Sequence, residues 1–146
     1  MSRSEVPRDY LIPRGIFYTV QYVELNLQVE YNICPIPKPR MSNRDRWLRP
    51  PRPAVKRYWD FCLQCKLEKV VLPCYGAHVI FILPMPKTWS KKKKIQYDGK
   101  PHMDTPDLDN LTKSLGDAIY SNDSGIYDIW IEKKWGITGK ILIEER

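Results

Sequence analysis

The sequence YGAHVIFIL at residues 75–83 decides the fold that we expect for this chain. The stretch is rich in β-branched and aromatic residues and lies between prolines, which is typical of a β-strand. Alternate positions place Tyr75, Ala77, Val79, Phe81 and Leu83 on one face and His78, Ile80 and Ile82 on the other. Because both faces are mainly apolar, we expect both to be covered, as they are in a central strand.

The segments on either side of this strand predict helices and further strands. Residues 54–69 carry apolar side chains at three- and four-residue steps, which is the period of an amphipathic helix, and residues 107–120 also predict a helix. An earlier strand is predicted from Ile16 to Ile33, because apolar and polar side chains alternate toward its end. Residues 126–134 and 140–144 predict two short strands joined by a glycine-containing turn.

This order of elements predicts an α+β fold. We expect one mixed sheet of about four strands with helices packed against it, and two long basic loops that each precede a helix. A chain of 146 residues is by default a single domain. We expect residues 16–146 to form that domain and residues 1–15, which contain prolines and several charged groups, to be a flexible extension.

The charge balance favours a polyanionic partner. The chain has 24 Lys and Arg against 17 Asp and Glu, a net charge of +7, and basic domains of this kind attract nucleic acid. Simple solubility is the alternative explanation. No apolar run approaches the roughly 20 residues that span a bilayer, and the N-terminus lacks the apolar core of a signal peptide. We therefore expect a cytoplasmic protein that does not bind membranes.

The cysteines do not predict a metal site. Cys62 and Cys65 form a lone Cys-x-x-Cys pair, and Cys34 and Cys74 are isolated. A structural zinc site would need a second pair or nearby histidines at ligand spacing. We expect free thiols in or near the core.

Two segments between the predicted elements are candidates for binding DNA. Residues 35–53 combine prolines with cations and hold Met41 and Trp47, and cations beside an aromatic ring suit a phosphate backbone and exposed bases. A solvated linker explains this segment equally well. Residues 84–106 contain a lysine run, which is most often a solvated, mobile loop or a localisation signal. The candidate DNA-binding residues are Lys38, Arg40, Arg44, Arg46, Lys91, Lys92, Lys93, Lys94 and Lys100.

The sequence PDLDNLTK at residues 106–113 carries the strongest chemical signal. Pro106 favours an extended backbone just before it, so Asp107 and Asp109 stand where an extended segment enters a helix and their carboxylates can converge. Lys113 follows Asp109 by one helical turn and can reach the same place. The alternative is that one of these acids only caps the helix, although capping explains two acids and the later Asp123 less well.

A carboxylate cluster in a basic protein points to a bridging cation. Carboxylates repel a bound DNA backbone unless a cation lies between them, and Mg²⁺ is typically held by one or two carboxylates together with phosphate. Such a cation would polarise a phosphodiester and activate water, and Lys113 would offset charge in the transition state. No glycine-rich phosphate loop is present, which argues against ATP hydrolysis.

At these residues the sequence resembles the RusA family of Holliday-junction resolvases of bacteria, phages and prophages. The resemblance spans roughly residues 31–145 and rests on DLDNLTK at residues 107–113, on Asp117-Ala118, on Asp123 before a strand that opens with Ile126, and on the upstream Pro37–Arg40 and Gly99–His102 stretches. It implies a homodimer that uses Mg²⁺, with Mn²⁺ as a substitute, to make paired symmetric nicks in a four-way junction.

The resemblance also implies roles for single residues. Asp107, Asp109 and Asp123 resemble the three metal-binding acids, and Lys113 resembles the catalytic lysine. Asn122 stands where members often have another acid, which would weaken the metal site. Pro106 stands where some members have a basic residue, so one phosphate contact would either be missing or be supplied by the Lys91–Lys94 run.

Two other functions remain open at this point. One is a non-catalytic protein that binds branched DNA and whose acids only cap a helix. The other is a nuclease with broader specificity that cuts flaps, forks or other branched DNA. The family resemblance implies the cytoplasm of a bacterial host and a phage or prophage source.

Overall fold

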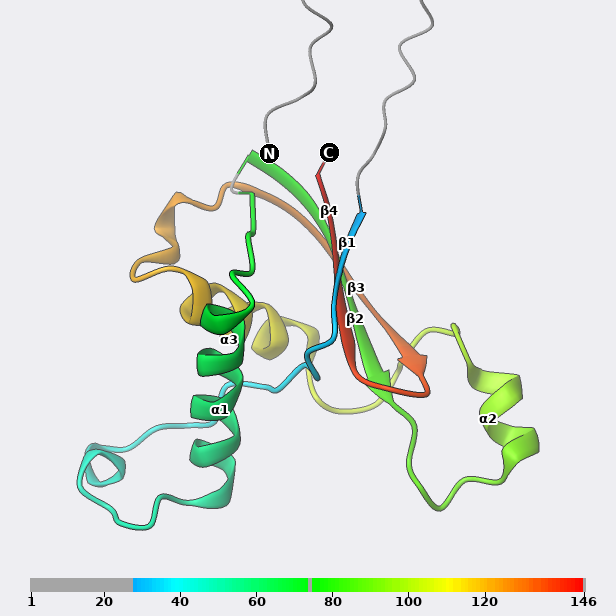
Figure 1. The fold of residues 1–146 in the computed structure, drawn as a ribbon, viewed down its shortest axis with the longest axis horizontal. Helices are drawn as coiled ribbons and strands as arrows, with labels where there is room; N and C mark the ends of the chain where they lie inside the picture. The colour runs from blue at the N-terminus through cyan, green and yellow to red at the C-terminus, as the bar shows by residue number, and fades with distance from the viewer. Residues whose placement is uncertain (1–27, 74, 146) are drawn as a thin grey trace, which may run out of the picture.

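The computed structural model describes residues 28–73 and 75–145 of this chain (Figure 1). The extension expected at residues 1–15, most of the strand expected from Ile16 to Ile33, and Cys74 lie outside the described residues.

The described residues form a single small domain around a mixed, open, four-stranded sheet. The strands are β1 (Gln28–Tyr31), β2 (Tyr75–Pro84), β3 (Asp128–Gly136) and β4 (Lys140–Glu145), in the spatial order β1-β4-β2-β3. β2 pairs in parallel with β3, whereas β4 is antiparallel to both β1 and β2. The sheet class, and the interior position predicted for residues 75–83, are confirmed.

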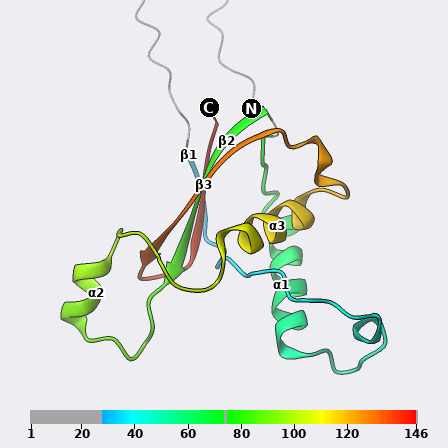
Figure 2. The ribbon, with the colours of Figure 1, turned by 180° about the vertical axis from the view of Figure 1, so that it is seen from behind.

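The helices α1 (Pro53–Leu67) and α3 (Leu108–Ile119) pack on one face of the sheet (Figures 1 and 2). Both confirm helices expected from sequence, and α1 begins with Pro53, a position where the missing N–H costs no hydrogen bond. The core between them and the sheet consists chiefly of Tyr58, Phe61, Val79, Phe81, Leu111, Leu115, Ile141 and Ile143. The fold is therefore α+β, as predicted.

The expectation that both faces of β2 are covered holds fully for only one of them. Ala77, Val79, Phe81 and Leu83 are buried against the helices. On the opposite face Ile80 is buried, while His78 and Ile82 remain half-buried among side chains of the neighbouring strands. The ring of His78 stacks on Trp130 of β3 at a centroid distance of 4.8 Å, so shelter on this face comes from the sheet itself.

The chain crosses the end of β2 between the last two strands. β3 and β4 follow each other in sequence but flank β2, so residues 137–139 must pass over that end. Glycines allow this close approach. A Cβ on Gly136 would lie 2.2 Å from Cγ2 of Ile82, and one on Gly139 would lie 2.7 Å from Cα of Cys34.

The expectation of thiols in or near the core holds for Cys65 and Cys62 among the described residues, whereas Cys34 is exposed. Cys34, Cys62 and Cys65 are free thiols, and Cys65 is buried in the core. Burial raises the pKa of Cys65 to about 12, which keeps it protonated and unreactive at neutral pH. No helix among residues 28–73 and 75–145 is long and apolar enough to cross a membrane.

The prediction that residues 84–106 form a loop is partly wrong. Lys91–Tyr97 form the helix α2, which projects from the body of the domain beside the end of β3 (Figure 1). Ser90 caps it, because its Oγ accepts a hydrogen bond from the backbone N–H of Lys93 at 3.2 Å. The ring of Trp89 packs between Tyr97 and Trp135, with centroids 5.2 and 4.8 Å away. The lysine run is therefore part of an ordered helix.

The proline-rich segment 35–53 also contains regular structure that its composition did not predict. Asn43–Arg46 form a short 3-10 helix, η1, before the start of α1. Proline restricts the residues around it, but η1 lies between the proline groups and escapes that restriction.

Candidate active site

The N-terminus of α3 places the two acids where the sequence predicted them. Asp107 has an extended backbone, with φ −68° and ψ 144°, and Asp109 lies in the first turn of the helix. Both side chains are exposed. Asp107 occupies the N-cap position, yet its side chain makes no capping hydrogen bond. Its carboxylate therefore remains available to a ligand.

A lysine from β3 holds the segment that leads into these acids. Nζ of Lys133 donates a hydrogen bond to the carbonyl oxygen of Pro106 at 2.7 Å, and another to the carbonyl oxygen of Asp104. The backbone N–H of His102 bonds to the carbonyl oxygen of Lys133 at 3.1 Å. The sheet thus fixes the position at which the chain enters α3.

His102 also helps to hold the segment that leads into α3, because it packs against β3. Its side chain is buried at 5% exposure, and its ring lies 3.9 Å from that of Trp135 between centroids. Burial, and then the charge of Lys133, lower the pKa of His102 below its ordinary value. The imidazole is therefore neutral at pH 7 and acts as a packing group beneath the entry to α3.

Lys113 lies on α3 between the acidic residue Asp109 and a second acid, Asp117, which is paired with a lysine. At 3.6 residues per turn, Asp109 and Asp117 lie about 40° on either side of it around the helix axis. On the Asp117 side, Nζ of Lys38 forms an ion pair with Oδ2 of Asp117. Lys113 therefore has the carboxylate of Asp109 on one side, called the acidic side below, and the ammonium group of Lys38 on the other, called the basic side.

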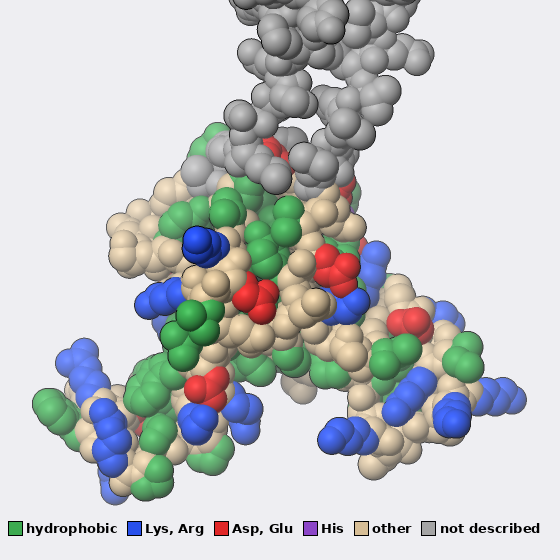
Figure 3. Space-filling model, viewed as in Figure 1, with side chains coloured by type: hydrophobic (Ala, Val, Ile, Leu, Met, Phe, Trp, Pro, Cys, Tyr) green, Lys and Arg blue, Asp and Glu red, His purple; other side chains and the backbone are tan. Residues whose placement is uncertain are grey.

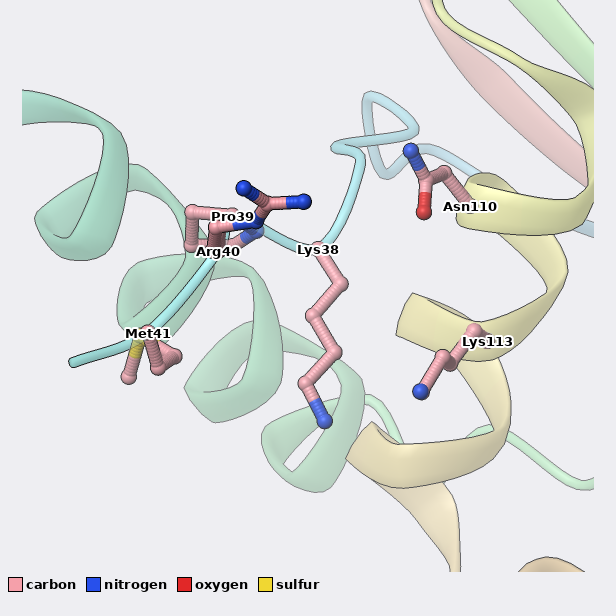
Figure 4. Close-up of a pocket in the computed structure, with 6 residues that line it drawn as sticks. All are labelled: Lys38, Pro39, Arg40, Met41, Asn110 and Lys113. Carbon is pink, nitrogen blue, oxygen red and sulfur yellow. The ribbon is translucent and has the colours of Figure 1, made fainter.

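The basic side is a pocket of about 420 Å³ (Figure 4). Its lining is Lys38, Pro39, Arg40, Met41, Asn110 and Lys113. Lys113 extends from α3 toward Lys38, and Asn110 stands one turn above it on the same helix. A pocket with three cations and one amide has the donors that bind a phosphate group.

Asp123 lies beside the last turn of α3, and the described residues do not bring it together with Asp107 and Asp109. It begins the short 3-10 helix η2 (Asp123–Gly125), and a Cβ added to Gly116 would lie 3.6 Å from Oδ2 of Asp123. Gly116 follows Asp109 by two helical turns on the same stripe, about 10 Å along the axis. Asn122, where family members often have an acid, caps η2 through a 3.0 Å hydrogen bond from the N–H of Ser124 to its Oδ1. It has a structural role here.

The donor set suits a hard divalent cation, although the described residues form no ready-made metal cage. No hydrogen bond or ion pair engages the carboxylates of Asp107, Asp109 and Asp123 within residues 28–73 and 75–145. In the same residues, no three His, Cys, Asp or Glu side chains are grouped closely enough to hold an ion. Mg²⁺ accepts one or two carboxylates and keeps several waters, so free, exposed carboxylates fit it by chemistry.

A comparison with models of known protein families gives the family of this chain. Residues 30–145 match the family model described as endodeoxyribonuclease RusA. The chain belongs to the RusA family. The match includes α3, η2 and both basic segments, so the RusA resemblance seen in the sequence is confirmed. A search of curated proteins finds no match.

In this RusA-family protein the other candidate DNA-binding cations lie on two separate projections. Arg44 and Arg46 belong to η1, and the lysine run belongs to α2. Figure 3 shows Lys and Arg side chains gathered on both projections of the face it views, with the body of the domain between them. Nζ of Lys93 lies 4.1 Å from the ring centroid of Trp89, and that of Lys100 lies 5.7 Å from Tyr97. Those two lysines are partly engaged by aromatic rings.

Three further residues of the site were not predicted. Asn110 was visible within the DLDN motif and stands one turn before Lys113, so helical spacing could have indicated it. Asp117 was noted only as part of the family resemblance, and nothing local indicates that Lys38 pairs with it. Lys133 gave no signal, because it is one of two adjacent lysines on a strand and its partners are backbone carbonyls.

Proposed function

We propose that this RusA-family endodeoxyribonuclease is Mg²⁺-dependent and resolves four-way DNA junctions by paired symmetric nicks. The observation that carries the proposal is the position of Lys113, between the free carboxylates of Asp107 and Asp109 and the basic pocket of Lys38 and Arg40. A nuclease needs these two environments side by side, one for a cation and one for the DNA backbone.

The proposed roles follow from the two sides of α3. Asp107, Asp109 and Asp123 would hold Mg²⁺ or Mn²⁺, which when bound polarises a phosphodiester and lowers the pKa of a water. Lys38, Arg40 and Asn110 orient the phosphate in the pocket. Lys113 places its ammonium group where negative charge develops, a contribution that is largest in the transition state. Lys133 and His102 keep the entry to α3 in place.

A homodimer is part of the proposal. A four-way junction has two-fold symmetry, and paired nicks require two active sites related by the same axis. Two copies would also double the basic surface carried by η1 and α2. We place such an enzyme in the cytoplasm of a bacterial host, encoded by a phage or prophage, because the RusA resemblance implies that setting.

The alternative of a non-catalytic DNA-binding protein makes a different prediction for Asp107. A carboxylate retained only as a cap should accept a hydrogen bond from the first turn, and the side chain of Asp107 accepts none. A nuclease with broader specificity would use the same site, so only the choice of substrate separates it from a resolvase.

The test is single-turnover cleavage of a labelled four-way junction and of a linear duplex with the same sequence, each with Mg²⁺ and with EDTA. We expect paired cuts in the junction, with Mg²⁺ only. Asp109→Asn should lose cleavage by roughly 100-fold or more, as when one group that stabilises the transition state is removed, and should still bind the junction. Asp60→Asn, which removes an exposed acid from α1, is the matched control. Normal cleavage by Asp109→Asn would disprove the assignment.

A further inference from the structure

Trp47 is exposed at the C-terminal end of η1, in the proline-rich segment 35–53. Its side chain is 83% exposed, whereas Trp135 is 7% exposed. Tryptophan is among the side chains that gain most from burial. A tryptophan held in water beside the domain is therefore a candidate for contact with a ligand that has a flat, apolar face.

The turn that carries Trp47 is held in place by hydrogen bonds to the buried side chain of Asp45. Asp45 is 3% exposed and accepts hydrogen bonds from the backbone N–H of Ser42 at 2.7 Å and from Nε and Nη2 of Arg52 at 2.7 and 2.8 Å. The backbone N–H of Trp47 bonds to the carbonyl oxygen of Arg44 at 3.1 Å. The tryptophan is thus presented by a fixed backbone, which reduces the entropy lost when it binds.

The surroundings of Trp47 are cationic. Arg44, Arg46 and Arg49 are exposed, and none of them pairs with a carboxylate within residues 28–73 and 75–145. Among the described residues, the guanidinium of Arg49 bonds only to the carbonyl oxygens of Arg46 and Leu48. An aromatic ring among unpaired guanidinium groups matches the surfaces that bind unpaired nucleotides, where bases stack on the ring and phosphates meet the cations.

The turn is also joined to the basic pocket. Nη2 of Arg52 donates a hydrogen bond to the carbonyl oxygen of Arg40 at 2.9 Å, and Arg40 lines the pocket beside Lys113. η1 therefore extends the pocket wall away from α3, at the lower left of Figure 1. A DNA strand whose backbone lies in the pocket can continue directly onto this turn.

We propose that Trp47 stacks on an unpaired or unstacked base at the branch point of the DNA, and so makes the enzyme selective for branched over linear DNA. The inference rests on the proposed function, because it assumes that the pocket beside Lys113 holds a DNA backbone. Base pairs inside a linear duplex have both faces covered by their neighbours, so away from the helix ends only a branch or a single strand offers a free face to the indole.

Binding without divalent metal tests this proposal, because it does not depend on cleavage. The measurement is fluorescence anisotropy in EDTA, with a four-way junction and a linear duplex that has the same arm sequence. Trp47→Ala should weaken junction binding by roughly tenfold, the loss expected for one stacked base. Duplex binding, which rests on phosphate contacts, should stay within about twofold.

Three matched variants separate stacking from other contacts. Trp47→Phe keeps a ring and should retain most of the junction affinity, whereas Trp47→Leu keeps only an apolar side chain and should behave like Trp47→Ala. Arg46→Ala should weaken junction and duplex alike. Leu67→Ala removes an exposed apolar side chain at the end of α1 and should change neither affinity.

The branch-point base can also be observed directly. A junction with 2-aminopurine at the branch point should lose fluorescence when the wild-type protein binds, because the base stacks on the indole, and should lose less with Trp47→Leu. An equal loss of junction and duplex affinity, unchanged affinities for both, or dissociation of a dimer in light scattering when Trp47 is replaced would each overturn the proposal. Cleavage by Asp109→Asn tests the nuclease assignment separately, since that result leaves these binding measurements intact.

Discussion

Lys38 forms an ion pair with Asp117, which joins the proline-rich segment to the last turn of α3. Lys38 lines the basic pocket, whereas Asp117 lies outside its lining. The carboxylate therefore holds Lys38 beside Lys113 and neutralises part of the positive charge that a phosphate would meet. The pair sets both the shape of the pocket and its affinity for an anion.

Replacing Asp117 should strengthen DNA binding. Asp117→Asn releases Lys38, and because partly exposed ion pairs are weak, we expect junction affinity to rise by roughly two- to fivefold. The log–log salt slope should become steeper by about 0.9 if the released Lys38 then neutralises one phosphate. Asp60→Asn makes the same charge change on α1, where Asp60 pairs with Lys56, and should leave the slope unchanged. Equal effects of the two variants would mean that only net charge matters.

Lys113 should be needed for cleavage but not for metal binding. Lys113→Ala removes the ammonium group between the acidic and basic sides of α3, and we expect cleavage to fall by roughly 100-fold or more. Mn²⁺ affinity, measured by calorimetry, should not fall, because no carboxylate is lost. Lys38→Ala is the comparison: it should weaken junction binding more than it slows the cleavage step at saturating protein. A Lys113→Ala variant with normal single-turnover cleavage would contradict the role proposed here.

The salt dependence of binding should show how many phosphates the lysines of α2 neutralise. Replacing Lys91, Lys92 and Lys94 with alanine removes charge while favouring the helix, since alanine has the highest helix propensity. Lys93 is kept because its Nζ lies over the ring of Trp89. Affinity should fall, and the salt slope should become shallower by about 0.9 for each phosphate that the variant no longer neutralises.

Circular dichroism and an α1 variant control the α2 experiment. Helix content should be unchanged in the triple variant. Alanine at Lys56, Arg57 and Lys66 removes the same charge from α1 and should change the slope less. If the α2 variant keeps the wild-type slope, the lysine run faces solvent and does not contact DNA.

Local sequence pattern was enough to predict most of the fold. The apolar stretch at residues 75–83 indicated an interior strand, and the three- and four-residue steps of residues 54–69 indicated α1. Both signals are local, because a strand or helix repeats within the segment itself. α2 was missed for the opposite reason. Its lysines show no apolar period, and its Tyr97 packs on Trp89, which in turn packs on Trp135, a residue distant in the sequence.

The candidate site divides in the same way. Asp107, Asp109 and Lys113 are close in sequence, so local geometry predicted their proximity: an extended residue leads into the helix, and one helical turn separates Asp109 from Lys113. The approach of Asp123 to Gly116 depends on how the chain folds back after α3. The bond from Lys133 to the carbonyl of Pro106 requires β3 to pass beneath the loop. Interactions of this kind arise from the tertiary fold, so a pattern within one segment of the sequence cannot predict them.

His102 should make the protein less stable as the pH falls. Its folded-state pKa lies below its ordinary value of 6.5 because of burial and the charge of Lys133. Below about pH 6.5 the unfolded chain therefore takes up a proton that the folded chain resists, and the free energy of unfolding decreases until the folded-state pKa is reached. Urea unfolding between pH 7.5 and 5 should show this decrease. His102→Gln, although less stable overall, should show a smaller one, and an equal decrease in both would exclude His102 as its source.

Lys133 should position the active site without contacting DNA. Lys133→Met keeps the length of the side chain but loses both hydrogen bonds to the carbonyl oxygens of Asp104 and Pro106. Hydrogen bonds from a charged donor contribute about 1.5–3 kcal/mol each when buried, and less when partly exposed as here, so we expect modest destabilisation.

Cleavage at saturating protein should fall by roughly tenfold in Lys133→Met, because a misplaced Asp107 loses catalytic geometry. Junction affinity should change little. The pKa of His102, followed by NMR, should rise, because the charge of Lys133 helps to lower it. Lys133→Arg should recover part of the cleavage, since it restores a charged donor.

The next residue on β3 supplies the matched control. Lys134 pairs through its Nζ with Glu132 at 3.0 Å, and because neighbouring residues on a strand point to opposite faces, it points away from the loop that Lys133 holds. Lys134→Met makes the same chemical change on the same strand, so it should leave cleavage and the pKa of His102 unchanged. If both variants slow cleavage equally, the effect comes from lost surface charge. If only Lys133→Met does so while junction affinity holds, the two hydrogen bonds to carbonyl oxygens fix the position of Asp107.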